Sequence, residues 1–305
     1  MRIGVISAGG VGGYLAAKLL AANVDVSVVA RGKHLDAIRD GGLTLTTPEG
    51  TMTVKPRVAT SDAAEIGPVD VVLFAVKMPD LAAAATATLP MLGPETGVIP
   101  FQNGVEATEL LAPIVGADRA MSGACYIFSE IEGPGHIKQV GAPGRFLFGE
   151  ADGSQSARSH AFRALATGAG IDAPEPADMR LEMWKKFSFL VAMSGMVATT
   201  RSNVGAIRSD PVMRAAFGRA IEEAVAVAEA EGVAMPPDSV ALYHRFLDGV
   251  PAEARSSMAK DLDAGKPIEA EWLNGAVDRL GKARGVDTPV NSTLYAALRP
   301  FANGR

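Results

Sequence analysis

The sequence predicts an α/β fold, in which a doubly wound parallel sheet is followed by an all-helical second half. The apolar run Ile3–Ile6 leads into a glycine cluster, a segment rich in Ala and Leu, and the Val-rich run Val24–Val29, which together have the length of a βαβ unit. Continuous apolar runs such as Val69–Val76 are typical of buried parallel strands. Strand patterns end near residue 172. We therefore expect two domains, residues 1–172 and 178–305.

The first domain contains most of the expected strands. Tyr14–Ala22 should be a helix, because Leu15, Leu19 and Leu20 would share one face. Gly41–Val54 has the pattern of a hairpin around a Pro-Glu-Gly turn. The remaining expected elements are a helix at Leu81–Leu89, a strand at Gly97–Phe101, strands and hairpins within Ala120–Glu150, and a last strand with a linker at Ile171–Pro176.

The second domain is expected to be entirely helical. A long apolar helix should span Met179–Thr199, and an amphipathic helix should span Asp210–Glu231 and end at Gly232. The other expected helices are Pro237–Leu247, Ala252–Leu262, Ile268–Arg284 and Ser292–Phe301.

The composition excludes several classes of function. The chain has 305 residues and a net charge of −5 without a basic block, which argues against nucleic-acid binding and against a polybasic membrane surface. The longest clearly apolar run, Val71–Val76, is far shorter than the roughly 20 residues of a membrane span. The N-terminus lacks the pattern of a signal peptide, and Cys125 has no second cysteine to pair with. We expect a cytoplasmic protein, and its alanine-rich helical half leaves a homodimer possible.

The glycine cluster predicts a Rossmann-type dinucleotide site. Backbone N–H groups at the start of the following helix would bind a pyrophosphate, and glycines would allow the phosphates to approach. The pattern departs from G-x-G-x-x-G only at its first glycine, which is a serine. A glycine-rich turn without a ligand is the alternative. The expected cofactor-binding residues of this turn are Ser7, Ala8, Gly9, Gly10, Val11 and Gly12.

The end of the second strand favours NADP(H) over NAD(H). An acidic residue would be expected there for the ribose hydroxyl of NAD, and the chain has Arg31 and Lys33 instead. The guanidinium of Arg31 can bind a 2′-phosphate through two hydrogen bonds. Lys77, at the end of the Val69–Val76 strand, is a candidate second cation. Ordinary solvated surface charges are the alternative for all three residues.

Several short segments, taken in order, carry a family resemblance. They are the glycine turn with Ala30-Arg31-Gly32, Val76-Lys77, Gln102-Asn103-Gly104-Val105, Trp184-Lys185-Lys186-Phe187, Ser256-Ser257-Met258 with Asp261, and Ile268-Glu269-Ala270-Glu271 with Asn274-Gly275. The chain resembles the ketopantoate reductase (2-dehydropantoate 2-reductase) family over nearly its whole length. The resemblance implies NADPH-dependent reduction of a 2-keto acid, foremost 2-dehydropantoate to pantoate for pantothenate and coenzyme A synthesis.

The resemblance also implies roles for individual residues. Lys186 matches the catalytic lysine, and Glu269 matches a carboxylate beside the cofactor and that lysine. Asn103 would lie near nicotinamide and substrate, and Ser257 would bind substrate. A lysine ammonium can stabilise the charge that develops on a ketone oxygen and deliver a proton to it. The alternatives are a lysine that extends to solvent, a helix-terminal acid for Glu269, and a capping or surface hydroxyl for Ser257.

The chain departs from the family where asparagines are expected. Leu190 and Ser194 stand four and eight residues after Lys186, and Val204 stands at the third asparagine position, next to Asn203. Ser194 and Asn203 are the expected substitutes as substrate-binding residues, and Arg201 is a candidate for binding a carboxylate, or else a surface ion.

These losses predict a less polar pocket and leave two alternative functions open. One is a paralogous NADPH-dependent reductase of a less polar keto acid or ketone, and the other is a non-catalytic NADP-binding sensor. The four histidines show no metal-binding spacing, so we expect no metal.

Overall fold

The computed structural model describes residues 1–305, which divide into two compact units. The first unit comprises Met1–Gln102 and Glu106–Met179, and the second comprises Asn103–Val105 and Arg180–Arg305. The short segment Asn103–Val105 thus belongs with the C-terminal helices, although it lies inside the N-terminal half of the sequence. None of the helices combines the length and the apolar character that a membrane span requires.

The first unit is built on a five-stranded parallel sheet, as predicted. Its strand order is β5-β2-β1-β6-β7, so the order reverses at the central strand β1. Ligands of such sheets bind beyond the carboxyl ends of the strands at this reversal. The strands are β1 (Arg2–Ile6), β2 (Asp25–Val29), β5 (Ala59–Thr60), β6 (Val69–Phe74) and β7 (Leu92–Pro100).

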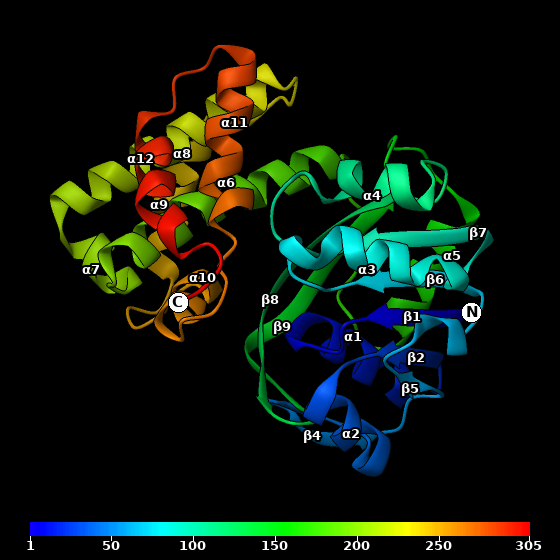
Figure 1. Ribbon diagram of the computed structural model, residues 1–305. Coiled ribbons are helices and arrows are strands. Elements are labelled where there is room, and N and C mark those ends of the chain that lie inside the picture. Colours follow the sequence, from blue (N-terminus) through cyan, green and yellow to red (C-terminus); the bar gives the residue numbers. More distant parts are fainter. The chain divides into compact units, whose positions relative to one another are not determined.

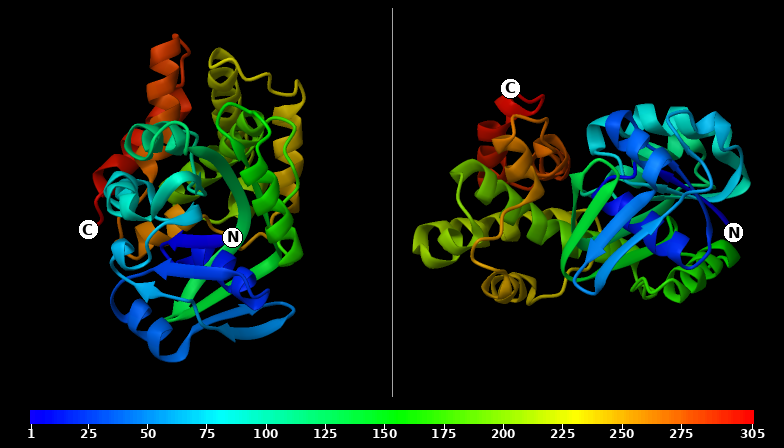
Figure 2. Two further views of the ribbon diagram at one scale, coloured as in Figure 1. Left: turned by 90° about the vertical axis from the view of Figure 1, so that its right-hand side faces the viewer. Right: turned by 90° about the horizontal axis from the view of Figure 1, so that it is seen from below.

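A second sheet of four strands, ordered β4-β3-β9-β8, completes the first unit. Its strands are β3 (Leu43–Thr47), β4 (Gly50–Val54), β8 (Met121–Gly133) and β9 (His136–Glu150). The predicted hairpins are confirmed, and β8 and β9 form a long antiparallel pair that runs beside α1 (Figures 1 and 2). The predicted strand at Ile171–Pro176 is wrong, because only Asp172 forms a single bridge there and two prolines remove backbone donors.

The helices of the first unit differ most from the prediction. They are α1 (Gly10–Ala21), α2 (Gly32–Gly41), α3 (Leu81–Thr88), α4 (Ala107–Val115) and α5 (Ala157–Gly168). The sequence did not predict α2, α4 or α5. Helix α1 begins four residues before Tyr14, although glycine disfavours helix interiors. A Cβ atom at Gly12 would lie 2.0 Å from the Ser7 carbonyl oxygen, so close packing requires glycine in this first turn.

The second unit is all-helical, as predicted. Its helices are α6 (Met179–Thr200), α7 (Val204–Ser209), α8 (Pro211–Ala230), α9 (Ser239–Gly249), α10 (Ser257–Asp263), α11 (Asn274–Arg284) and α12 (Pro289–Leu298), with short 3₁₀ turns η4 (Ala270–Trp272) and η5 (Arg299–Phe301). The expected helix Ala252–Leu262 begins only at Ser257, because the Ser256 hydroxyl caps it by accepting from the Ala259 N–H at 3.1 Å. The expected helix Ile268–Arg284 is interrupted at Leu273, where ψ is −100°.

A buried polar network holds α6 against the helices around it. The Asn274 side chain donates to the Val191 carbonyl on α6 at 3.2 Å and to Asn291 Oδ1 on α12 at 2.9 Å. Asn291 in turn donates to the Ala220 carbonyl on α8 at 3.0 Å. Both asparagines are fully buried. Gly195 allows this arrangement, since a Cβ there would lie 2.7 Å from the Asn274 amide.

Candidate active site

The glycine turn after β1 leaves a helix N-terminus uncapped by any side chain. Gly9 is the N-cap residue of α1, and neither a side-chain cap nor an acidic residue occurs in the first turn. A Cβ on Gly9 would meet only the Ser7 hydroxyl, at 3.5 Å, so the backbone is open at this point. Ser7 itself has φ of +76°, the left-handed conformation in which glycine is usually found. An open, uncapped helix N-terminus fits the pyrophosphate of a dinucleotide.

Two residues that the sequence did not single out as site residues lie against this turn. His34 Nδ1 accepts from the Gly135 N–H at 3.0 Å, which leaves Nε2 to donate to the Ala8 carbonyl at 2.8 Å. The backbone of Ser129 lies so close to Gly10 that a Cβ there would be 2.4 Å from the Ser129 carbonyl oxygen. The Ser129 hydroxyl is buried without a hydrogen-bond partner. The residues in these contacts lie between 26 and 119 positions apart in the chain, so no local pattern could reveal them.

The carboxyl ends of the strands beside β1 carry positive charge. Arg31 follows β2 and is the N-cap residue of α2, whose first turn contains Lys33 and no acid. Arg31 and Lys33 are exposed, and neither forms a hydrogen bond or ion pair. Two unpaired cations are unfavourable at a helix N-terminus, where the helix dipole is positive, unless an anion binds there. Lys77 is exposed just beyond β6, on the other side of β1.

In the second unit, the structure brings Asn103 to the predicted catalytic lysine. Lys186 lies half-buried on α6, and its Nζ donates to Asn103 Oδ1 at 2.9 Å. Gly104 has φ of +102° and approaches η4 so closely that a Cβ would lie 3.2 Å from the Trp272 carbonyl oxygen. Glu269 is half-buried at the start of η4. The segment around Asn103 therefore contacts both the helix of Lys186 and the turn that begins at Glu269.

Two of the predicted substrate-binding residues have hydrogen-bond partners within the protein. Arg201 donates to Asp263 at 2.9 Å, and hydrogen bonds from Arg255 and Arg201 lower the pKa of Asp263. The Asn203 side chain caps α7 by accepting from the Ala206 N–H at 3.0 Å. Both side chains therefore have a partner within the second unit, and their assignment to the substrate stays a prediction.

The other residues expected near the substrate differ in exposure. Leu190 is half-buried one turn after Lys186, and Ser194 is 1% exposed one turn further along α6. Val204 is fully buried in the core of the second unit. Ser257 is exposed as the first residue of α10, while its neighbour Ser256 provides the cap.

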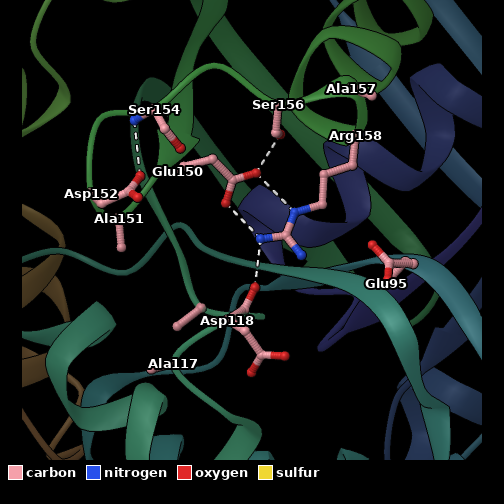
Figure 3. A pocket seen from close by; sticks show the side chains of 11 residues that line it. Glu95, Ala117, Asp118, Glu150, Ala151, Asp152, Ser154, Ser156, Ala157 and Arg158 are labelled. Carbon is pink, nitrogen blue, oxygen red and sulfur yellow. Dashed lines mark hydrogen bonds and ion pairs between the residues drawn. The ribbon is translucent and has the colours of Figure 1, made fainter.

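The first unit also contains a hollow of about 460 Å³ that is lined mainly by charged and small side chains (Figure 3). It lies beside the amino end of β7, near Glu95, and thus at the opposite edge of the sheet from the glycine turn. Burial by itself would raise the pKa of Glu150, but hydrogen bonds from Arg158 and Ser156 outweigh it and lower that pKa. Arg158 also donates to the Asp118 carbonyl at 2.7 Å. The buried charges of the hollow, Glu150 and Arg158, are thus paired with each other, and we assign it a structural role.

Comparison with known proteins identifies the family. The model of "Ketopantoate reductase PanE/ApbA" matches residues 3–153, and that of "Ketopantoate reductase PanE/ApbA C terminal" matches residues 178–302. The chain belongs to the ketopantoate reductase family. Ketopantoate reductases of this family include the 2-dehydropantoate 2-reductase of Mesorhizobium japonicum, which is 34% identical over 99% of this chain and 98% of its own. That of Halobacterium salinarum is 30% identical over 98% of each chain.

Solved structures of ketopantoate reductases share the whole architecture. The PanE/ApbA family ketopantoate reductase from Ralstonia eutropha JMP134 superimposes with a TM-score of 0.91 at 30% identity, over 99% of this chain and 98% of its own. The 2-dehydropantoate 2-reductase from Geobacter metallireducens GS-15 has a TM-score of 0.92 at 27% identity, over 98% and 99%. D-mandelate dehydrogenase, solved with NADH and anilino(oxo)acetate, shares the fold at 19% identity, with a TM-score of 0.91 over 99% and 98%.

Proposed function

We propose that this protein reduces a 2-keto acid to the 2-hydroxy acid with NADPH, and that 2-dehydropantoate is the first substrate to test. The observation that supports this most directly is the hydrogen bond from Lys186 Nζ to Asn103 Oδ1 in a member of the ketopantoate reductase family. Each 2-dehydropantoate 2-reductase named above is similar to this chain over nearly its full length.

The residues around the glycine turn fit a phosphorylated dinucleotide. The open N-terminus of α1 offers backbone N–H groups to the pyrophosphate, and the unpaired Arg31 and Lys33 offer cations to a 2′-phosphate. Lys77 and Glu269 are further candidates for cofactor contact. When bound, NADPH supplies the hydride.

The chain's own residues then act on the ketone. Negative charge develops on the oxygen as the carbonyl carbon is reduced, and the ammonium of Lys186 stabilises that charge and gives it a proton. The Asn103 amide oxygen, which accepts from Lys186, orients the ammonium. Glu269 is proposed to act on the same lysine from the start of η4. The candidates for binding the substrate's polar groups stay Ser194, Arg201, Asn203 and Ser257.

A less polar substrate is the second candidate. Leu190 places an apolar side chain one turn beyond Lys186, and Val204 is fully buried in the core. A keto acid or ketone with fewer hydroxyl groups than 2-dehydropantoate would leave fewer polar groups unpaired beside such residues.

One assay separates these functions. NADPH oxidation is followed with 2-dehydropantoate and with a panel of apolar 2-keto acids and ketones, and NADH serves as the cofactor control. We expect kcat/KM for 2-dehydropantoate of about 10⁴ M⁻¹s⁻¹ or more, as for a working enzyme. A preference for an apolar member of the panel would instead support the paralogous reductase. Tight NADPH binding with no turnover of any compound would support the sensor and contradict the proposal.

A further inference from the structure

Gln102 carries a buried amide that has no partner within the protein. The residue is 6% exposed, and neither Oε1 nor Nε2 forms a hydrogen bond. Buried polar groups in proteins are nearly always paired, because an unpaired one loses its bonds to water and gains none in exchange. An amide with both its donor and its acceptor unpaired therefore points to a ligand.

The position of Gln102 fits a ligand site. The Phe101 N–H donates to the Phe74 carbonyl at 2.9 Å, so the pairing of β7 with β6 continues to the residue before Gln102. Gln102 thus lies at the carboxyl edge of the parallel sheet, the same edge at which the glycine turn follows β1. In the chain it directly precedes Asn103, which accepts from Lys186.

The chemistry of the amide narrows the choice of ligand. The carboxylate of a keto acid and the phosphates of a dinucleotide accept hydrogen bonds, so neither could satisfy the Gln102 carbonyl oxygen. A primary carboxamide presents a carbonyl and an NH₂ group side by side and can pair with both atoms of Gln102. The nicotinamide ring carries such a group, and it must lie close to the ketone that Lys186 activates.

We propose that Gln102 binds the carboxamide of the nicotinamide ring through two reciprocal hydrogen bonds. This inference rests on the proposed function, because it takes a nicotinamide dinucleotide to be the cofactor. It adds a residue that positions the reactive ring, at the sheet edge just before the residue that accepts from the catalytic lysine.

The test compares Gln102→Met with a matched variant, Gln139→Met. Gln139 is also a buried glutamine of the first unit, at 2% exposure, but its amide donates to the Val140 and Ala142 carbonyls at 2.8 and 2.7 Å. Thermal unfolding of the free proteins and dissociation constants are measured for NADPH and for 2′-phospho-ADP-ribose, which lacks the nicotinamide ring. The third ligand in these binding measurements is the analogue of NADPH in which an acetyl group replaces the carboxamide.

We expect Gln102→Met to raise the melting temperature of the free protein and to weaken NADPH binding tenfold or more. Its affinity for 2′-phospho-ADP-ribose should be unchanged, and the acetyl analogue should lose less affinity than NADPH does. Gln139→Met should lower the melting temperature and leave NADPH affinity unchanged. The inference is overturned if Gln102→Met binds NADPH as the wild type does, loses affinity for both ligands equally, or is destabilised like Gln139→Met. Wild-type protein that binds no nicotinamide dinucleotide would overturn the proposed function as well, so the two failures are distinguishable.

Discussion

Lys186 and its neighbour Lys185 are both on α6 but have different hydrogen-bond partners. Lys185 forms an ion pair at 2.7 Å with Glu182 on its own helix. Lys186 donates to Asn103, which is 83 residues away in the chain. The first contact is an ordinary helix-surface pair, while the second holds an ammonium half-buried at a fixed place.

The first prediction follows from this pair. Lys186→Met should lower kcat by about 10²–10⁴-fold, because the ketone oxygen loses its proton donor, with little change in the dissociation constant of NADPH. Lys185→Met is the matched control and should retain kcat. Steady-state kinetics and cofactor titration measure both. Equal losses in the two variants would show that Lys186 acts only through the stability of α6.

We expect Arg31 to determine the preference for NADPH over NADH. Arg31→Ala should weaken NADPH binding by about 10–100-fold, because a charge-assisted contact with the 2′-phosphate is lost, and should leave NADH binding unchanged. Arg57→Ala is the control, since Arg57 is an exposed arginine of the same unit that pairs with Asp25 at 2.6 Å. Titration of each variant with NADPH and with NADH gives the dissociation constants to compare. A uniform loss for NADPH and NADH would contradict the assignment of Arg31 to the 2′-phosphate.

At the scale of elements, α6 is held by buried amides rather than by apolar packing alone. Asn274 joins it to α11 and α12, and Asn291 extends the connection to α8. A similar arrangement exists in the first unit, where His34 of α2 contacts both the glycine turn and the turn between β8 and β9. In each case a polar side chain fixes an element that carries candidate site residues.

Removing the Asn274 side chain should therefore lower the free energy of unfolding much more than removing an exposed asparagine does. We expect Asn274→Ala to lower the free energy of unfolding by about 2–4 kcal/mol, because it leaves a cavity and unpaired buried groups. Asn203→Ala, which removes only the cap of α7, should cost about 1 kcal/mol. Urea unfolding of both variants gives the comparison. Similar losses of unfolding free energy in the two variants would mean that the buried network stabilises the protein no more than a surface helix cap does.

For the whole molecule, acid stability depends on carboxylates that are paired within each unit. Glu150 in the first unit is 7% exposed and is bonded to Arg158 at 2.6 Å. In the second unit, hydrogen bonds from Lys282 and Ser292 lower the pKa of Asp278 against the opposing effect of burial. A lowered folded-state pKa stabilises the protein above the ordinary pKa, and this contribution is lost as the pH falls through the folded value.

The pH prediction follows from Glu150, whose ordinary pKa is 4.5. Stability should be constant above that value and fall below it. Glu150→Gln should lower the melting temperature near neutral pH and make the loss of stability below pH 4.5 shallower. Glu132→Gln is the control, because Glu132 pairs with Lys138 in an exposed position and should contribute little. An unchanged acid profile in Glu150→Gln would contradict this assignment.

Local patterns predicted much of the architecture. Val-rich runs predict buried strands, and the absence of strand patterns after residue 178 predicts the helical half. These inferences succeed because the hydrophobic period acts over a few residues, whereas the dinucleotide site at the glycine turn and Arg31 stays a prediction. The helices that were missed, such as α2 and α4, are short segments whose stability comes from packing on the sheet.

The sequence by itself determined the fold class, the glycine turn and the residue types available for catalysis. Only the tertiary structure decided which of them meet: Asn103 with Lys186 across 83 residues, and His34 with Gly135 across 101. It also paired Arg201 with Asp263, and it left the Gln102 amide unpaired. The physical reason is that such contacts depend on how whole elements pack, which no short segment of sequence encodes.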